Sequence, residues 1–345
     1  MTEISFGIFD HIDKQSQPLS ATYADRLRLL EVADAAGFYS FHLAEHHATP
    51  LCMAAAPSLF LAALTQRTRQ LRLGPLVFLL PVYHPLRLIE EVCMLDQLSG
   101  GRLDIGVGRG ISPIELRYMD VDPNESRDRF REELEILLLG LRSTRLNYQG
   151  RFHRLNNVPI EFSPVQKPHP PIWYPTSAGD RVPWIGEQGF STVLPDGGER
   201  LKVAVDRYWE AWHRNHAGDD RQPRIGTIRT LFIANSEREA LDIARPNFRQ
   251  HYNSLVKLWN EHNLPTATAT FTPDLDQEIA DDKAYIGTAS QVRDQIAQLV
   301  DRTGIEYVVL RPLFGDMPID RALYSFGMFV NEVMPAFQRA AVATA

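Results

Sequence analysis

The sequence contains little cysteine and no long apolar run. Its 345 residues include only Cys52 and Cys93, which are too few and too far apart for a zinc knuckle or a disulfide framework. The longest apolar stretches, such as residues 76–82, are too short to span a bilayer. The N-terminus, Met1-Thr2-Glu3-Ile4, has no basic region with an apolar core behind it. We therefore expect a soluble, cytoplasmic protein.

An excess of positive charge is also missing. The chain has 36 Lys and Arg against 43 Asp and Glu, a formal net charge of −7, so neither a nucleic acid nor an anionic membrane is an expected partner. Hydrophobic residues make up 44% and charged residues 23%, which excludes a disordered or collagen-like chain. One large barrel can hold this length, so we expect a single domain over residues 1–345.

What the sequence does contain is a repeated local order. Four times an amphipathic run ends in glycine and an apolar, strand-like run follows; the glycines are Gly37, Gly100 (followed by Gly101), Gly189 and Gly304. A glycine just beyond a helix adopts the left-handed conformation at little steric cost. The order of helix, glycine and apolar strand predicts βα units around a parallel sheet.

Eight strands are expected, with helices after most of them. The expected strands are residues 4–9, 39–44, 71–79, 102–108, 172–176, 191–194, 225–234 and 306–311. This predicts an α/β fold, a (β/α)₈ TIM barrel. A doubly wound sheet is the alternative, but its glycine fingerprint is absent after the first strand. Two stretches, 147–170 and 260–283, are too long for ordinary connections and are expected to be insertions at the rim.

Candidate chemical groups follow several of the expected strands, where a barrel has its active site. Ala44-Glu45-His46-His47 ends the second strand, and strand alternation would turn at most one of the histidines inward. Gly106-Val107-Gly108-Arg109-Gly110 follows the fourth, and its arginine offers a planar fork for phosphate oxygens. Thr176-Ser177-Ala178-Gly179-Asp180-Arg181 follows the fifth and could seat a phosphate at a helix start.

Each motif also has a purely structural explanation. The histidines could make ordinary hydrogen bonds at the rim, the glycines could form a tight turn, and Thr176 or Ser177 could cap a helix. No His-Glu-x-x-His occurs, so no metal site is expected. Gly-x-Ser-x-Gly is absent as well, which argues against a Ser-His-Asp triad.

Several short motifs together resemble the bacterial luciferase-like, flavin-dependent monooxygenase family, in the family's order and over nearly the whole chain. They are Gly37-Phe38, Ala44-Glu45-His46-His47, Leu79-Leu80-Pro81-x-x-His84-Pro85, Leu95-Asp96-Gln97-Leu98-Ser99-Gly100-Gly101-Arg102, Gly106-Val107-Gly108-Arg109-Gly110, Gly287-Thr288 and Val333-Met334-Pro335.

The resemblance implies a site for FMN. Arg109, together with Ser177, Ala178 and Arg181, would hold the phosphate, and the flavin ring would lie against a non-proline cis peptide at Leu76-Val77. His46 would lie near the reactive edge of the flavin as hydrogen-bond donor or base. Light-emitting members carry a cysteine where this chain has Gly108, so the resemblance implies a relative that does not emit light.

The implied activity is monooxygenation. Reduced FMN would arrive from a separate flavin reductase and react with dioxygen to a C4a-(hydro)peroxide, which oxygenates a small organic substrate. The alternatives are a deazaflavin-dependent oxidoreductase that transfers hydride and a catalytically silent flavin-binding homologue. We also expect a homodimer through the helices at 54–65 and 86–98, and a lid over residues 260–283 in which Phe271 closes over the mouth.

Overall fold

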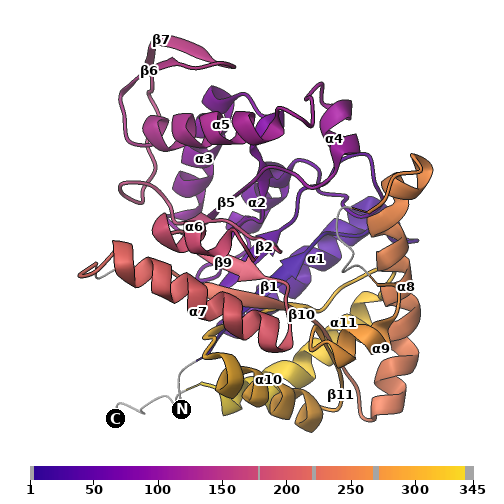
Figure 1. Cartoon of the computed structure of the whole chain (residues 1–345). Coiled ribbons are helices and arrows are strands. Elements are labelled where there is room, and N and C mark those ends of the chain that lie inside the picture. Colours follow the sequence, from indigo (N-terminus) through magenta and orange to yellow (C-terminus); the bar gives the residue numbers. More distant parts are fainter. Residues whose placement is uncertain (1–3, 178, 220–222, 267–271, 339–345) are drawn as a thin grey trace.

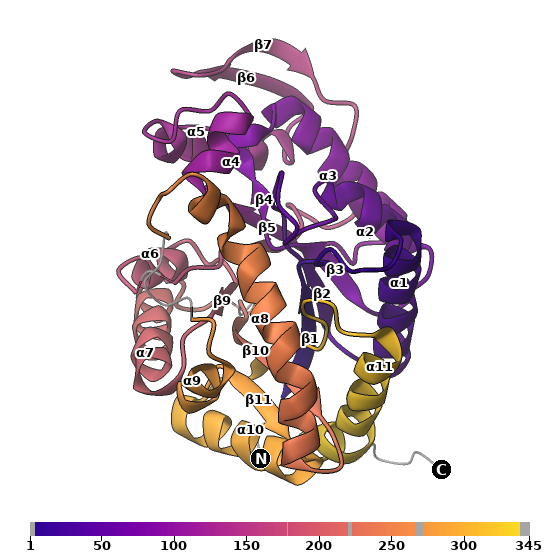
Figure 2. The same ribbon diagram turned by 90° about the vertical axis from the view of Figure 1, so that its right-hand side faces the viewer.

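Eight parallel strands form a closed barrel in the computed structural model, which describes residues 4–177, 179–219, 223–266 and 272–338 (Figures 1 and 2). In ring order they are β1 (Ser5–Asp10), β2 (Ser40–Leu43), β3 (Arg72–Pro75), β5 (Ile105–Gly108), β8 (Ile172–Trp173), β9 (Thr192–Leu194), β10 (Ile225–Ile233) and β12 (Tyr307–Arg311). Parallel ladders join most neighbours, and single bridges, Leu73 to Leu103 and Trp173 to Ser191, complete the ring. The predicted (β/α)₈ barrel is confirmed.

Helices surround the strands of the barrel (Figure 1). They are α1 (Leu19–Ala35), α2 (Pro57–Thr65), α3 (Pro85–Ser99), α4 (Pro113–Tyr118), α5 (Ser126–Gly140), α6 (Val182–Glu187), α7 (Gly198–Asn215), α8 (Glu237–Glu261), α9 (Leu275–Ala280), α10 (Ala289–Thr303) and α11 (Ile319–Met328). The turns η1 (Leu80–Val82), η2 (Phe329–Val333) and η3 (Met334–Ala336) complete the helical elements.

Local sequence signals set the limits of these helices. Helix α3 begins at Pro85, a residue suited to a first helical turn, and ends at Ser99, after which Gly100 has a left-handed φ of 66°. Helix α10 begins with a capping box between Thr288 and Gln291 and ends at Gly304, with φ of 68°. The helix–glycine–strand order in the sequence thus corresponds to real helix ends.

The expected strand over residues 71–79 is divided in two. β3 ends at Pro75, the bond between Leu76 and Val77 is cis, and β4 (Phe78–Leu79) pairs only with β5. The backbone N–H of Leu76 still donates to the carbonyl of Leu43 at 2.6 Å. The chain therefore changes partners at the cis bond, a change that a continuous run of apolar residues does not reveal.

The two long stretches contain more structure than the sequence suggested. Residues 147–170 include part of an antiparallel hairpin of β6 (Arg145–Gln149) and β7 (Arg154–Pro159), which lies along α5 because Glu132 accepts three backbone N–H groups near its tip (Figure 1). In the second stretch, residues 260–261 end α8 and 275–280 form α9. Phe271 lies outside the described residues.

One long helix crosses the face of the barrel. α8 runs in front of the strands between α7 and α11 (Figure 2), and the short strand β11 (Ala284–Gly287) pairs with the last residues of β10. The position of α8 brings residues from the middle of a helix to the carboxyl ends of the strands. Within the described part of the chain, no helix is both long and apolar enough to cross a membrane.

Candidate active site at the carboxyl ends of the strands

His46 is held by a buried carboxylate. Glu115, on α4, lies 3.1 Å through Oε1 from Nδ1 of His46, and its Oε2 accepts the backbone N–H of His47 at 2.8 Å. Burial opposes ionisation of Glu115, but its hydrogen bonds and the charges of the two histidines lower its pKa below the usual value. An ionised Glu115 accepts a hydrogen bond from the N–H at Nδ1, which leaves Nε2 of a neutral His46 as the acceptor nitrogen.

His46 remains accessible while Glu115 does not. The His46 side chain is 15% exposed and the Glu115 side chain 3%. Its Nε2 has no protein hydrogen-bond partner within the described ranges. A histidine with one nitrogen fixed and the other open to solvent is suited to donate or accept a proton.

His47 has a different role. Its Nε2 lies 2.8 Å from Oε1 of Glu45, whose Oε2 accepts from the backbone of Leu79 and the hydroxyl of Tyr83. Burial disfavours the charged form of His47, but Glu45 outweighs it and raises the pKa. Strand alternation does not apply to either histidine, because β2 already ends at Leu43. His47 ties the end of β2 to the β4 segment.

A second cluster beside His46 was not predicted. The ring centroid of His11, just after β1, lies 5.9 Å from that of His46 and 5.1 Å from that of His251 on α8. His251 Nδ1 lies 2.9 Å from Asp13 and its Nε2 lies 2.8 Å from Nη1 of Arg311. Burial, then the charges of His251, His46 and Arg311, lower the pKa of His11 well below its usual value.

Part of this cluster has a sequence signal. His11 directly follows the first strand and Arg311 ends the last one, so the rule that led to His46 would also have found them. His251 has no such signal, because it lies in the middle of a 25-residue helix. Only the course of α8 brings it here.

Two arginines meet on the other side of the barrel. Arg109, after β5, donates to the hydroxyl of Ser126, and Arg181, before α6, donates to the hydroxyl of Tyr174, each at 3.1 Å. Burial and then the nearby charge of Arg181 lower the pKa of Arg109. Within the described residues neither arginine has a carboxylate at ion-pair distance. Two such guanidinium groups suit an anion, and they fit the phosphate of FMN.

The remaining residues of the predicted phosphate site are less well defined. Ser177 is exposed in the loop after β8, and Ala178 lies outside the described residues. The cis bond at Leu76-Val77 is present. Gly106 and Gly108 of β5 allow this segment to approach closely, since a Cβ on Gly106 would lie 2.1 Å from the carbonyl oxygen of Pro75.

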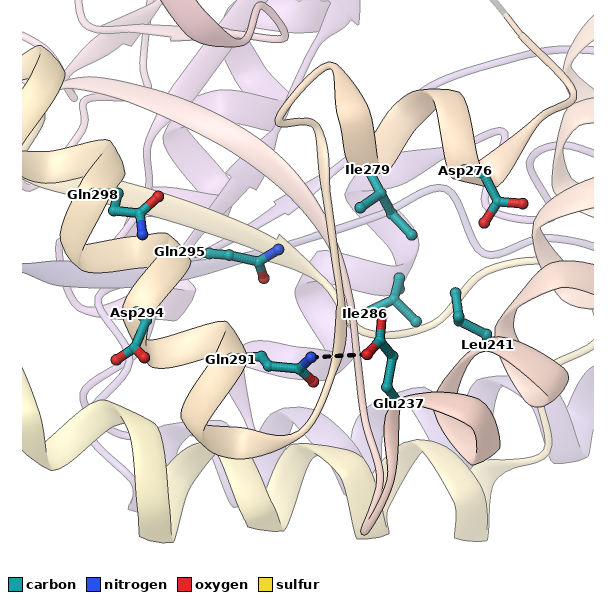
Figure 3. Close-up of a pocket in the computed structure, with 9 residues that line it drawn as sticks. All are labelled: Glu237, Leu241, Asp276, Ile279, Ile286, Gln291, Asp294, Gln295 and Gln298. Carbon is teal, nitrogen blue, oxygen red and sulfur yellow. Dashed lines mark hydrogen bonds between the residues drawn. The ribbon is translucent and has the colours of Figure 1, made fainter.

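A separate hollow lies outside the barrel, between α8, α9, β11 and α10 (Figure 3). Its volume is about 320 Å³, and the amide of Gln291 donates to Glu237 across it at 3.0 Å. None of the predicted site residues lines this hollow. Nor do the described residues contain a group of three or more His, Cys, Asp or Glu arranged to hold a metal ion.

The arrangement of histidines, arginines and cis bond around a (β/α)₈ barrel agrees with a comparison against known families. Residues 4–307 match the family described as luciferase-like monooxygenase. The chain belongs to this family. The luciferase-like barrel therefore accounts for nearly all of the sequence.

Two relatives extend over almost the full length. The uncharacterized protein y4wF of Sinorhizobium fredii is 37% identical over 336 residues, which cover 96% of this chain and 97% of the relative. The oxygenase component of flavin-dependent trigonelline monooxygenase from Acinetobacter baylyi is 27% identical, covering 98% and 96%. A homologue that matches nearly the full length of this chain is thus a component of a flavin-dependent monooxygenase.

Solved structures of other proteins have the same fold. Monooxygenase RslO1 from Streptomyces bottropensis has a TM-score of 0.86 and 26% identity, covering 97% of this chain and 100% of that one. Two others share only the fold. The FMN complex of the oxygenating constituent of 3,6-diketocamphane monooxygenase from Pseudomonas putida has a TM-score of 0.79 at 20% identity and 98% coverage of this chain. The coenzyme F420 dependent tetrahydromethanopterin reductase of Methanopyrus kandleri has a TM-score of 0.71 at 19% identity and 97% coverage of this chain. Both matches cover 100% of the other protein's chain.

Proposed function

We propose that this protein is the oxygenase component of a two-component monooxygenase, which takes reduced FMN from a separate flavin reductase and uses dioxygen to oxygenate a small organic molecule. The observation that carries the proposal is that Arg109 and Arg181 come near each other, with no carboxylate at ion-pair distance among the described residues, on the rim that also holds His46. The full-length relative named as an oxygenase component supports the same assignment.

The roles of the residues follow from their positions. Arg109 and Arg181, with Ser177 and Ala178, would hold the phosphate of FMN, and Leu76, Val77 and Gly108 would support its ring system. Bound reduced FMN supplies the electrons with which dioxygen is activated. This chain's part is to position the cofactor and the substrate and to keep water away from them.

His46 is the proposed proton carrier. Glu115 fixes Nδ1 of His46 as the donor nitrogen, so Nε2 is the atom at which a proton is held or moved. Helix α8 crosses the mouth of the barrel and contributes the buried His251 (Figure 2). It therefore reduces the access of bulk water to the same side of the rim.

The decisive experiment compares two cofactors and then tests oxygen. Purified protein is titrated with FMN and with F420 in parallel, and the FMN-loaded protein is reduced chemically and mixed with dioxygen in a stopped-flow instrument. We expect preferential binding of FMN, and oxygen-dependent reoxidation at a rate that differs from that of free FMN. Preferential binding of F420 would support hydride transfer instead. FMN binding with no difference from free flavin would indicate a silent homologue.

We further propose a homodimer. Exposed apolar side chains lie on α2 and α3, the helices expected at the interface: Leu59 is 75% exposed, Met94 51% and Leu98 48%. Apolar side chains this exposed are suited to burial against a second copy of the chain.

A further inference from the structure

Arg311 is a partly buried cation without an ion-pair partner. Its Nη1 donates to His251 Nε2 at 2.8 Å and its Nη2 to the hydroxyl of Thr230 at 2.5 Å, while Nε is buried with no partner. Within the described residues no carboxylate lies within ion-pair distance of its guanidinium. Burial lowers the pKa of Arg311, although Glu278, Asp13 and Asp10 act in the opposite direction. The charge is thus desolvated and only distantly compensated.

The nearby carboxylates are already engaged. Asp13 accepts a hydrogen bond from His251, and Asp10 is paired with Arg26 at 2.8 Å. Glu278 lies 3.9 Å from Lys283. Each therefore has a closer cationic or donor partner than Arg311. Among the described residues, three of the five N–H donors of the guanidinium have no hydrogen-bond partner, including the one on Nε.

His11 adds a second group without a protein partner. Among the described residues neither of its ring nitrogens makes a hydrogen bond, although its ring contacts those of His46 and His251. Burial, and then the charges of His251, His46 and Arg311, lower the pKa of His11, which favours the neutral ring. Because Asp10, Asp13 and Glu115 already have partners of their own, an added anion is the group that Arg311 and His11 can still bind.

Arg311 and the predicted phosphate site stand on opposite sides of the barrel. In the ring β1, β2, β3, β5, β8, β9, β10, β12, the strand that ends at Arg311 is four places from the strand before Arg109 in either direction. His46 follows β2, half-way between them. Arg311 therefore cannot share the phosphate held by Arg109, and it lies where a molecule beyond His46 would be placed.

Resting on the proposed function, we propose that the substrate is an organic carboxylate whose carboxylate group is bound by Arg311, with His11 as the neighbouring donor. A planar guanidinium edge matches the two oxygens of a carboxylate. The single positive charge of Arg311 also balances the single negative charge of a carboxylate, whereas the larger charge of a phosphate would need a second cation. The rest of the substrate would extend toward His46.

The test uses carboxylates and their uncharged amides as probes. Benzoate against benzamide, and hexanoate against hexanamide, are titrated into the FMN-loaded protein and followed by calorimetry. At least one carboxylate should bind about tenfold or more tightly than its amide, the effect of a charge-assisted hydrogen bond. Arg311→Gln should reduce the preference to within about twofold, and Arg311→Lys, which keeps the charge, should retain part of it.

Controls separate this proposal from its foundations. Arg224 lies just before β10, at the end of the barrel away from Arg311. Arg224→Gln should therefore leave the carboxylate preference unchanged. All three arginine variants are checked for folding by thermal unfolding. A wild-type protein without preference in either pair, or a preference that survives Arg311→Gln, would overturn the proposal. The proposal would also be overturned if Arg311→Gln lost as much affinity for FMN as for the carboxylate, because Arg311 would then serve the cofactor.

The proposed function can fail independently. If the protein binds no FMN, the same titrations are made without cofactor. A carboxylate preference that Arg311→Gln abolishes would then support the anion site while the flavin assignment fails.

Discussion

Gly108 and Val77 fit together with no room for another atom. A Cβ built on Gly108 would lie 2.5 Å from Cγ2 and 3.3 Å from Cβ of Val77. The side chain of a β-branched residue has few rotamers, so Val77 cannot simply turn away. The contact holds the segment of the cis bond against β5, beside Arg109.

Gly108→Ala should therefore displace Val77 and weaken FMN binding by about 1–2 kcal/mol, a usual cost of overpacking. FMN fluorescence titration measures this. Val77→Ala in the same chain should restore part of the affinity, because the clashing methyl group is gone. Gly327→Ala is the control, since a Cβ there meets nothing within 4 Å. Equal FMN affinity in Gly108→Ala and in the wild type would contradict the prediction that Val77 is displaced.

Arg109→Ala should weaken FMN binding by about 1.5–3 kcal/mol, the range of a charge-assisted hydrogen bond, and leave the fold intact. Arg181→Ala should weaken FMN binding as well. If both arginines bind one phosphate, the double variant should lose less binding free energy than the sum of the losses in the two single variants. Arg321→Ala on the surface serves as control. The phosphate assignment is wrong if both single variants bind FMN as wild type does.

His46→Ala should bind FMN normally but slow the reaction of bound reduced FMN with dioxygen roughly 10²–10⁴-fold. Glu115→Gln should slow it in the same direction, because the ionised acceptor on Nδ1 is lost. Stopped-flow absorbance provides the rates, with the exposed His213→Ala as control. A rate within a factor of about three of wild type would mean that His46 is not an acid–base group.

The α2–α3 surface should form the dimer interface. Light scattering at micromolar concentration should give twice the mass of the chain for wild type. Leu59→Glu combined with Met94→Glu should give the single mass, because two charges would be buried without partners. Tyr324→Glu, exposed on α11, should remain dimeric. A monomeric wild type would refute the prediction.

Acid should destabilise the fold through His42. This side chain is fully buried, and burial lowers its pKa to about 3. Between the unfolded value near 6.5 and about 3, the unfolded chain takes up a proton that the folded chain does not, so stability falls as pH falls through this window. The loss is roughly 1.4 kcal/mol per pH unit. In denaturant titrations, His42→Gln should show a shallower dependence; an unchanged slope would exclude His42 as the cause.

Local patterns were enough for the architecture. Glycines beyond helix ends, apolar strands and capping residues act within a few positions of the chain, so the barrel and the placing of His46 and Arg109 at strand ends could be predicted from them. The cis bond at Leu76-Val77 was implied only by the resemblance to the luciferase-like family. The break of the third strand was not visible, because both halves are equally apolar and only the change of pairing at Leu76 separates them. The hairpin along α5 was missed because its strands are largely polar and exposed, and β11 because it is only four residues long.

The sequence by itself determined the order of the barrel strands and most of their helices, and it placed His46 and Arg109 at strand ends. The tertiary structure decided what those side chains contact. Glu115 reaches His46 from 69 positions away, and Asp13 reaches His251 from 238. Such pairs depend on the closure of the barrel and on the course of α8 across its mouth. No periodicity encodes them, because hydrogen bonds between distant residues form only when the packing of the whole barrel brings the two groups together.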